Sequence, residues 1–290
     1  MPPVSIPLLD GFAPLTSRYN AAIVDLWGVV HDGTAVYAGA IECLGRMGDA
    51  GIRRVLLSNA PRRAEAVADR IAEIGVAPVC YDEIVTSGDL TRAALIDGAD
   101  PARPGEAYFH LGPERDRGIF EDLELRLVSD LAGAGFILNT GLFDDETEDE
   151  SHYESFLAEA HERDLAMICA NPDRAVIRGG QLVPCAGVLA AAYERHGGRV
   201  IYFGKPHRAA YRACFERLRG IAKRRIVAIG DGLNTDIAGA NAAGIDSIFV
   251  AGGLHAAELA AGDAPDPARI QAACAAAGVR ANAAMAELRW

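Results

Sequence analysis

The sequence predicts an α/β protein: a Rossmann-like, doubly wound parallel sheet into which a second α/β domain is inserted. Three observations predict this fold class. Short continuous apolar runs, typical of strands buried on both faces of a parallel sheet, recur along the chain. Helix-like segments separate these runs, as the crossovers of βαβ units require. A long segment with its own alternation of strands and helices divides the chain into two parts.

Residues 1–96 are predicted to form the first part of the main domain. The predicted strands are residues 21–24, 55–57 and 79–85. The predicted helices that follow them are residues 40–50, 59–75 and 90–96. Glycines end the first two helices and Ser87 precedes the third, which are usual terminators and caps.

Residues 97–184 are predicted to form the inserted domain. Its predicted strands are residues 107–111, 135–138 and 166–169, and its predicted helix is residues 151–163. The acidic run at residues 144–150 is interpreted as a solvated loop that leads into this helix, because acidic side chains favour a helix N-terminus.

The main domain is predicted to resume over residues 185–290. Its predicted strands are residues 200–203, 226–229 and 247–250, and its predicted helices are 186–196, 211–218 and 236–243. The alanine-rich tail from about residue 265 is predicted to be helical. It either packs on the core or supports a homodimer.

Polar side chains follow four of the predicted strands of the main domain. They are Asp25, Ser58, Lys205 and Asp231, with Asp236 shortly after. Because ligands bind outside the carboxyl ends of parallel strands, we expect these side chains to meet at one edge of the sheet. Together they can hold a metal ion, a nucleophile and a phosphate group.

Composition limits the compartment and the partners. The 290 residues carry a net charge of -12, which argues against nucleic acid, since such binding depends on many lysine and arginine contacts. The six cysteines lack the paired spacing of a zinc site, and no apolar run reaches the length of a membrane span. We therefore expect a cytoplasmic protein with reduced thiols, bound neither to nucleic acid nor to a membrane.

Four motifs carry a resemblance to a known family. They are Asp25-Leu26-Trp27-Gly28-Val29, Ser58-Asn59, Gly204-Lys205-Pro206 and Gly230-Asp231-Gly232-Leu233-Asn234-Thr235-Asp236. In order and spacing they resemble the motifs of the haloacid dehalogenase superfamily of hydrolases. The long insert, with Ala170-Asn171-Pro172-Asp173, is similar to the class IIA, NagD-like and p-nitrophenylphosphatase-like branch, in which the inserted α/β domain is a cap.

The resemblance implies a Mg²⁺-dependent phosphatase for a small phosphorylated metabolite. Asp25 would be the nucleophile that forms an aspartyl-phosphate, Ser58 would donate a hydrogen bond to the transferred group, and Lys205 would offset its charge. The residues expected at the metal are Asp25, the backbone carbonyl of Trp27, Asp231 and the supporting Asp236. Asn59 and, in the cap, Asn171 and Asp173 are the expected substrate contacts.

One position departs from the pattern of the family. Its phosphatases have a second aspartate, a general acid and base, two residues after the nucleophile, where this chain has Trp27. An indole cannot exchange a proton in that role.

Three interpretations therefore stay open. The protein is a phosphatase, either slow or assisted by another proton donor. His31 and Asp32 are candidates for that donor, although a turn at His31-Asp32-Gly33 is the favoured interpretation of these residues. It is a catalytically silent protein that binds or senses a phosphorylated ligand. Or it is a dehalogenase-like hydrolase, whose halide leaves without a proton, although that chemistry does not need the carboxylates Asp231 and Asp236.

Overall fold

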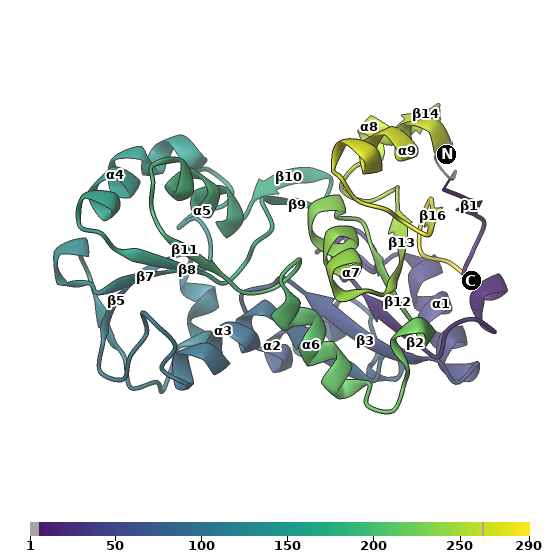
Figure 1. The fold of residues 1–290 in the computed structure, drawn as a ribbon, viewed down its shortest axis with the longest axis horizontal. Helices are drawn as coiled ribbons and strands as arrows, with labels where there is room; N and C mark the ends of the chain where they lie inside the picture. Colours follow the sequence, from purple (N-terminus) through teal and green to yellow (C-terminus); the bar gives the residue numbers. More distant parts are fainter. Residues whose placement is uncertain (1–5, 263) are drawn as a thin grey trace.

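The computed structural model describes residues 6–262 and 264–290 as two α/β lobes joined side by side (Figure 1). The first lobe is built on a seven-stranded sheet in which every neighbouring pair is parallel. Its strands, in spatial order, are β1 (Leu8–Leu9), β16 (Ala283–Met285), β13 (Asp246–Val250), β12 (Ile226–Gly230), β2 (Ala21–Val24), β3 (Arg53–Ser58) and β4 (Glu83–Thr86).

Helices cover both faces of this sheet, as a doubly wound fold requires. Alternate residues of β2 point to opposite faces. Ala22 and Val24 pack with α1 (Ala38–Asp49) and α2 (Ala64–Glu73), while Ala21 and Ile23 pack with α6 (Arg208–Arg217) and α7 (Ala238–Ala243). The predicted Rossmann-like core is confirmed.

The second lobe has a five-stranded sheet of its own, also parallel throughout. Its strands, in spatial order, are β11 (Val200–Tyr202), β8 (Ala166–Cys169), β7 (Phe136–Asn139), β5 (Ala107–Leu111) and β6 (Arg126–Val128). The helices α4 (Glu154–Glu162) and α5 (Ala186–Arg195) pack on one face. Residues near α3 (Ser87–Ile96) pack on the other.

An antiparallel hairpin of β9 (Ala175–Arg178) and β10 (Gln181–Pro184) leaves this lobe and lies between the two sheets (Figure 1). In the part of the chain that the structure describes, its two strands form a sheet of their own. The hairpin is thus placed to cover the end of the first sheet without belonging to it.

The structure corrects the assignment of residues 200–203 to the main sheet. The predicted strand exists, but β11 pairs with β8, with Val200 opposite Met167. Since α5 also packs on the second sheet, residues 186–202 lie with the second lobe, beyond the boundary expected at residue 184. The physical reason is that only a short loop joins α5 to β11, which keeps the strand beside its own helix.

Two smaller differences concern the ends of the predicted elements. Residues 78–80 form a short 3-10 helix before β4, where one strand over 79–85 was expected. After the short helix α8 (Ala256–Leu259), the alanine-rich tail contains α9 (Pro267–Ala276), but it then continues into β16, a strand inserted between β1 and β13. Pairing on both sides and burial of Ala283–Met285 outweigh the low strand preference of alanine.

The six cysteines are free and buried, as expected of core thiols. Among the described residues, none of the helices is both long and apolar enough to cross a membrane.

Candidate active site

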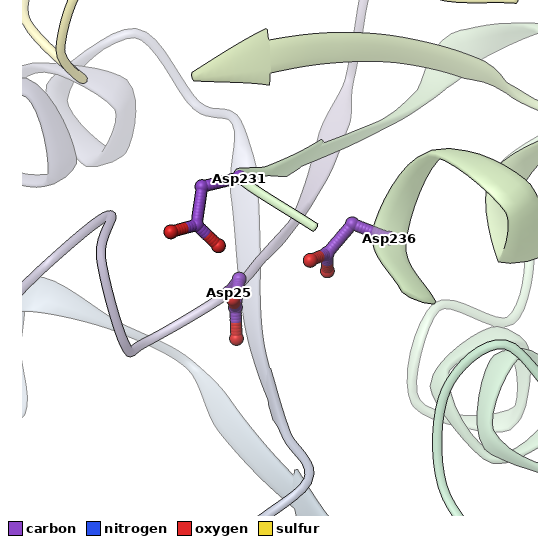
Figure 2. Close-up of side chains that lie close together, drawn as sticks. All are labelled: Asp25, Asp231 and Asp236. Carbon is purple, nitrogen blue, oxygen red and sulfur yellow. The ribbon is translucent and has the colours of Figure 1, made fainter. Parts of the chain in front are cut away.

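Three aspartates converge at the carboxyl end of the first sheet. Asp25 follows β2, Asp231 follows the neighbouring strand β12, and Asp236 lies in the helical turn at Leu233–Ile237. All three are buried, and each offers an oxygen within 4.8 Å of the others'. Figure 2 shows the three side chains close together, with the carboxyl groups of Asp231 and Asp236 directed toward Asp25. Adjacent parallel strands that end together produce this convergence.

Glycines let the backbone close around Asp231. Gly28 has a φ of +73°, and a Cβ there would lie 1.9 Å from the Asp231 Oδ2 atom. A Cβ on Gly253 would lie 2.1 Å from the same atom. The backbone N–H of Leu254 donates to this oxygen at 2.7 Å. The Asp231 carboxylate is therefore fixed between two stretches of backbone that only glycine permits.

Lys205 is the cation of the site. Its Nζ donates to Asp25 Oδ1 at 2.6 Å and to Asp236 Oδ1 at 2.9 Å, and its side chain is 2% exposed. Burial alone would lower the pKa of Lys205, but the carboxylates of Asp236 and Asp25 outweigh it and raise the pKa well above its ordinary value. The lysine is therefore charged at neutral pH.

The carboxylates outnumber this cation. Burial, reinforced by Asp236 and opposed by Lys205, raises the pKa of Asp25 well above its usual range. Burial and Asp236 also raise the pKa of Asp231 to about 7. Buried carboxylates with too few cations are costly. A divalent cation with a preference for oxygen ligands fits this site, because it would supply the missing positive charge.

A second group of predicted residues joins the two lobes beside Lys205. Asn59 accepts from the Lys205 backbone N–H at 2.7 Å and donates through Nδ2 to Asp173 Oδ1 at 2.9 Å. Asn171 Oδ1 accepts from the Asp173 backbone N–H at 3.1 Å. Asn59 thus holds the loop before β9 and the lysine segment together, and the structure brings all three predicted substrate contacts close to the carboxylates.

Ser58 ends β3 and is 1% exposed. Its Oγ accepts from the backbone N–H of Ala60 at 3.1 Å, as in a helix-capping turn. Its hydroxyl hydrogen is then available to donate. Ser58, Asn171 and Asp173 line a cavity of about 360 Å³ that residues of both lobes enclose.

Trp27 lies between this cavity and a smaller one lined by Asp25 and Asp231. Its ring packs over Gly33, where a Cβ would lie 2.3 Å from an indole carbon, and it meets the His31 ring edge-on at 5.0 Å. The indole therefore forms an apolar wall. The peptide after it lies against Asp231, as the contact of Gly28 with that carboxylate requires.

The two residues considered as substitute proton donors are engaged elsewhere. His31 Nδ1 accepts from the Gly33 backbone N–H at 2.9 Å, and burial lowers the His31 pKa to about 4. Asp32 accepts three hydrogen bonds, from the backbone of Thr34 and Ala35 and from the Thr34 hydroxyl. Together they form a turn, which is the interpretation that the sequence favoured.

Sequence reasoning missed several parts of the site. The glycine pair at 252–253, directly after an apolar run, was the available signal for a close backbone approach. Asp145, interpreted as part of a solvated acidic run, is only 11% exposed and pairs with Arg115 and Arg178 on the wall of the cavity. No local pattern marks that contact.

A doubly wound core with acidic side chains at its strand ends, facing an inserted α/β lobe, defines a hydrolase of the haloacid dehalogenase type. A haloacid dehalogenase-like hydrolase model matches residues 22–126, and a HAD-hydrolase-like model matches residues 202–276. This chain belongs to the haloacid dehalogenase-like hydrolases, in their class IIA, NagD-like branch.

Named relatives span most of the chain. Human chronophin is 30% identical over 252 residues, which cover 84% of this chain and 84% of chronophin. The ribonucleotide monophosphatase NagD of Escherichia coli K12 is 28% identical over 246 residues, covering 80% of this chain and 87% of NagD.

Two solved structures have folds similar to that of this chain. A haloacid dehalogenase-like hydrolase from Brucella suis 1330 is 38% identical, with a TM-score of 0.84, and the match covers 97% of this chain and all of that one. Glycerol phosphate phosphatase of Mycobacterium tuberculosis in complex with magnesium is 25% identical, with a TM-score of 0.61 over 83% of this chain and 70% of that one.

Proposed function

We propose that this protein is a Mg²⁺-dependent phosphatase that hydrolyses a small phosphorylated metabolite through an aspartyl-phosphate on Asp25. The observation that carries the proposal is the contact of a buried carboxylate with a buried lysine beside two further carboxylates. The phosphatase names of the relatives support it. So does the magnesium in a related structure.

The chemistry follows from the positions of the chain's own groups. Asp25 Oδ1 already accepts from Lys205 Nζ and from the Leu26 backbone, and so Oδ2 is the oxygen that attacks phosphorus. The P–O bond to the leaving group breaks as the Asp25–phosphorus bond forms. The leaving group departs as its anion and takes a proton from solvent. Water then attacks phosphorus and loses a proton to solvent, the bond to Asp25 breaks, and inorganic phosphate leaves with the carboxylate regenerated. Lys205 and Ser58 stabilise the charge on the phosphoryl oxygens in both steps.

Mg²⁺ would be held by Asp25, Asp231 and the Trp27 carbonyl, with Asp236 as support. When bound, it supplies positive charge that draws the phosphoryl group toward Asp25. Lys205 holds Asp25 and Asp236 in place, and Leu254 together with the flanking glycines orients Asp231.

Trp27 should make this phosphatase depend on its leaving group. General acid catalysis is typically worth about 10²–10⁴-fold, and its loss matters most for an alkoxide of high pKa. Because His31 and Asp32 form hydrogen bonds within their own turn, neither is placed to act as the general acid that Trp27 cannot supply. We therefore propose slow hydrolysis of alkyl phosphates and faster hydrolysis of aryl phosphates.

The same tryptophan favours a second candidate, a silent protein that binds or senses a phosphorylated ligand with Mg²⁺. Hydrolysis of p-nitrophenyl phosphate separates the two, because its phenolate leaves without an acid. Activity that needs Mg²⁺, is abolished by EDTA and is absent in Asp25→Asn supports the phosphatase. A folded wild-type protein that binds Mg²⁺ but hydrolyses no more than Asp25→Asn supports the silent binder.

We further propose a cytoplasmic location, which the buried free thiols support, and a homodimer. Size-exclusion chromatography with light scattering tests the second point.

A further inference from the structure

An arginine pair lies on the wall of the cavity that Ser58 lines. Arg115, from the 3-10 helix Glu114–Ile119, and Arg178, at the end of β9, both donate to the carboxylate of Asp145. Arg178 reaches both carboxylate oxygens, at 3.2 and 2.9 Å. All three residues line the cavity of about 360 Å³.

The cluster keeps an excess of positive charge. Within ion-pair distance, the Asp145 carboxylate contacts two guanidinium groups, neither of which can be deprotonated. Two further arginines that line the cavity are each matched by one carboxylate: Arg62 by Asp116 and Arg70 by Glu73, both at 2.9 Å. Asp145 is 11% exposed, whereas Arg115 is 44% exposed and can reach a ligand in the cavity. In a chain with a net charge of -12, this local excess favours an anion.

The arrangement of the arginines suits a carboxylate or a phosphate. Guanidinium groups bind both anions through paired N–H donors. Asp145 keeps the two like charges together in the free protein. An anion that binds beside them would therefore find guanidinium N–H donors that already lie close together.

We propose that Arg115 and Arg178 bind a second anionic group, a carboxylate or a further phosphate, on the phosphate ester that Ser58 and Lys205 hold by its phosphoryl group. This inference rests on the proposed function. It narrows the substrate to small esters with a negative charge at each end.

Matched substrate pairs test the inference. Glycerol 3-phosphate and 3-phosphoglycerate differ by one carboxylate, and fructose 1-phosphate and fructose 1,6-bisphosphate differ by one phosphate. The readout is the ratio of kcat/KM within each pair. In the wild type we expect a preference of about tenfold or more for the doubly anionic member of at least one pair, since hydrogen bonds to charged groups are worth that much. The pair that shows it identifies the anion.

Two kinds of variant should change the kcat/KM ratio in opposite directions. Arg115→Gln and Arg178→Gln should bring the ratio toward one, whereas Asp145→Asn, which frees both guanidinium groups, should raise it. Arg174→Gln, an exposed arginine outside the cavity lining, should keep the wild-type ratio. A wild-type ratio near one in both pairs would overturn the inference. So would arginine variants that lower both members of a pair equally, because that marks a purely structural ion pair.

Binding separates this inference from the proposed function. Isothermal titration calorimetry of Asp25→Asn with the same pairs measures affinity without turnover. If the wild type hydrolyses nothing, the proposed function fails, but tighter binding of the doubly anionic ligand still supports the arginine site. Equal binding within both pairs rejects it.

Discussion

Lys205 Nζ and Asp25 Oδ1 lie 2.6 Å apart, although 180 residues separate them in the sequence. Both side chains are almost fully buried. The lysine follows the last strand of the second lobe, and the aspartate follows β2, an interior strand of the first. The contact therefore joins the segment that crosses between the lobes to the proposed nucleophile.

Replacing this lysine should impair both stability and activity. Lys205→Met leaves Asp25 and Asp236 without their shared cation, and breaking a buried pair costs about 3–5 kcal/mol. We expect a lower free energy of unfolding without Mg²⁺, partly restored by Mg²⁺, together with loss of p-nitrophenyl phosphate hydrolysis. Urea denaturation with and without Mg²⁺ measures the effect. Lys223→Met, away from the site, is the control; equal effects of the two variants would contradict the prediction.

An aspartate at position 27 should restore the missing acid. Trp27→Asp is expected to raise kcat/KM for alkyl phosphates by about 10²-fold or more, with a smaller gain for p-nitrophenyl phosphate. Trp27→Asn also removes the indole from Gly33 but supplies no proton, and so it controls for the change in packing. A plot of rate against the pKa of the leaving group is the measurement. The same slope in Trp27→Asp and the wild type would argue against the proposed defect.

The close approach of the Gly253 backbone to Asp231 should determine how tightly the protein binds Mg²⁺. Gly253→Ala places a Cβ 2.1 Å from Asp231 Oδ2, and the carboxylate must move. We expect at least about tenfold weaker Mg²⁺ binding, since displacing a ligand by 1 Å is costly in a preorganised site. Gly45→Ala, in α1 with open space around it, is the matched control. Calorimetric titration with Mg²⁺ measures the affinity of each variant. An unchanged affinity in Gly253→Ala would show that Asp231 does not bind the metal.

Asp173 should affect substrate preference more than the chemical step. Its carboxylate accepts a hydrogen bond from Asn59 Nδ2 at 2.9 Å, and the residue lines both cavities. We expect Asp173→Ala to reorder kcat/KM across a panel of phosphorylated metabolites, with a smaller change for p-nitrophenyl phosphate. Equal losses on every substrate would instead indicate a role in holding the site together.

Acid should destabilise the second lobe through His110. Its ring bonds Thr140 Oγ1 at 2.9 Å, and burial, aided by Arg117, lowers its pKa from 6.5 to about 4. Between these two values the unfolded chain binds the proton and the folded one does not, and so stability falls as the pH drops from 6.5 toward 4. The loss is at most about 3 kcal/mol. Urea denaturation over this range should show a shallower pH dependence in His110→Gln; an unchanged slope would exclude His110 as its source.

Much of the first lobe was predictable because its signals are local. The apolar runs at β2, β3, β12 and β13 and the polar residues after them mark buried strands and their ends. Parallel strands bring those ends together, which anticipates the convergence of Asp25 with Asp231 and Asp236. The order of the motifs also indicated the family.

The sequence by itself determined most of the buried strands of the first sheet and the polar residues that follow them, because burial on both faces of a parallel sheet leaves a continuous apolar run in the chain. Only the tertiary structure decided that β11 joins the second sheet, that β16 inserts between β1 and β13, and that Arg115 and Arg178 meet at Asp145. An apolar run indicates that a strand is buried, but it does not indicate which strand it pairs with. Contacts between side chains distant in the sequence depend on how separate loops and strands pack against one another, which no local pattern encodes.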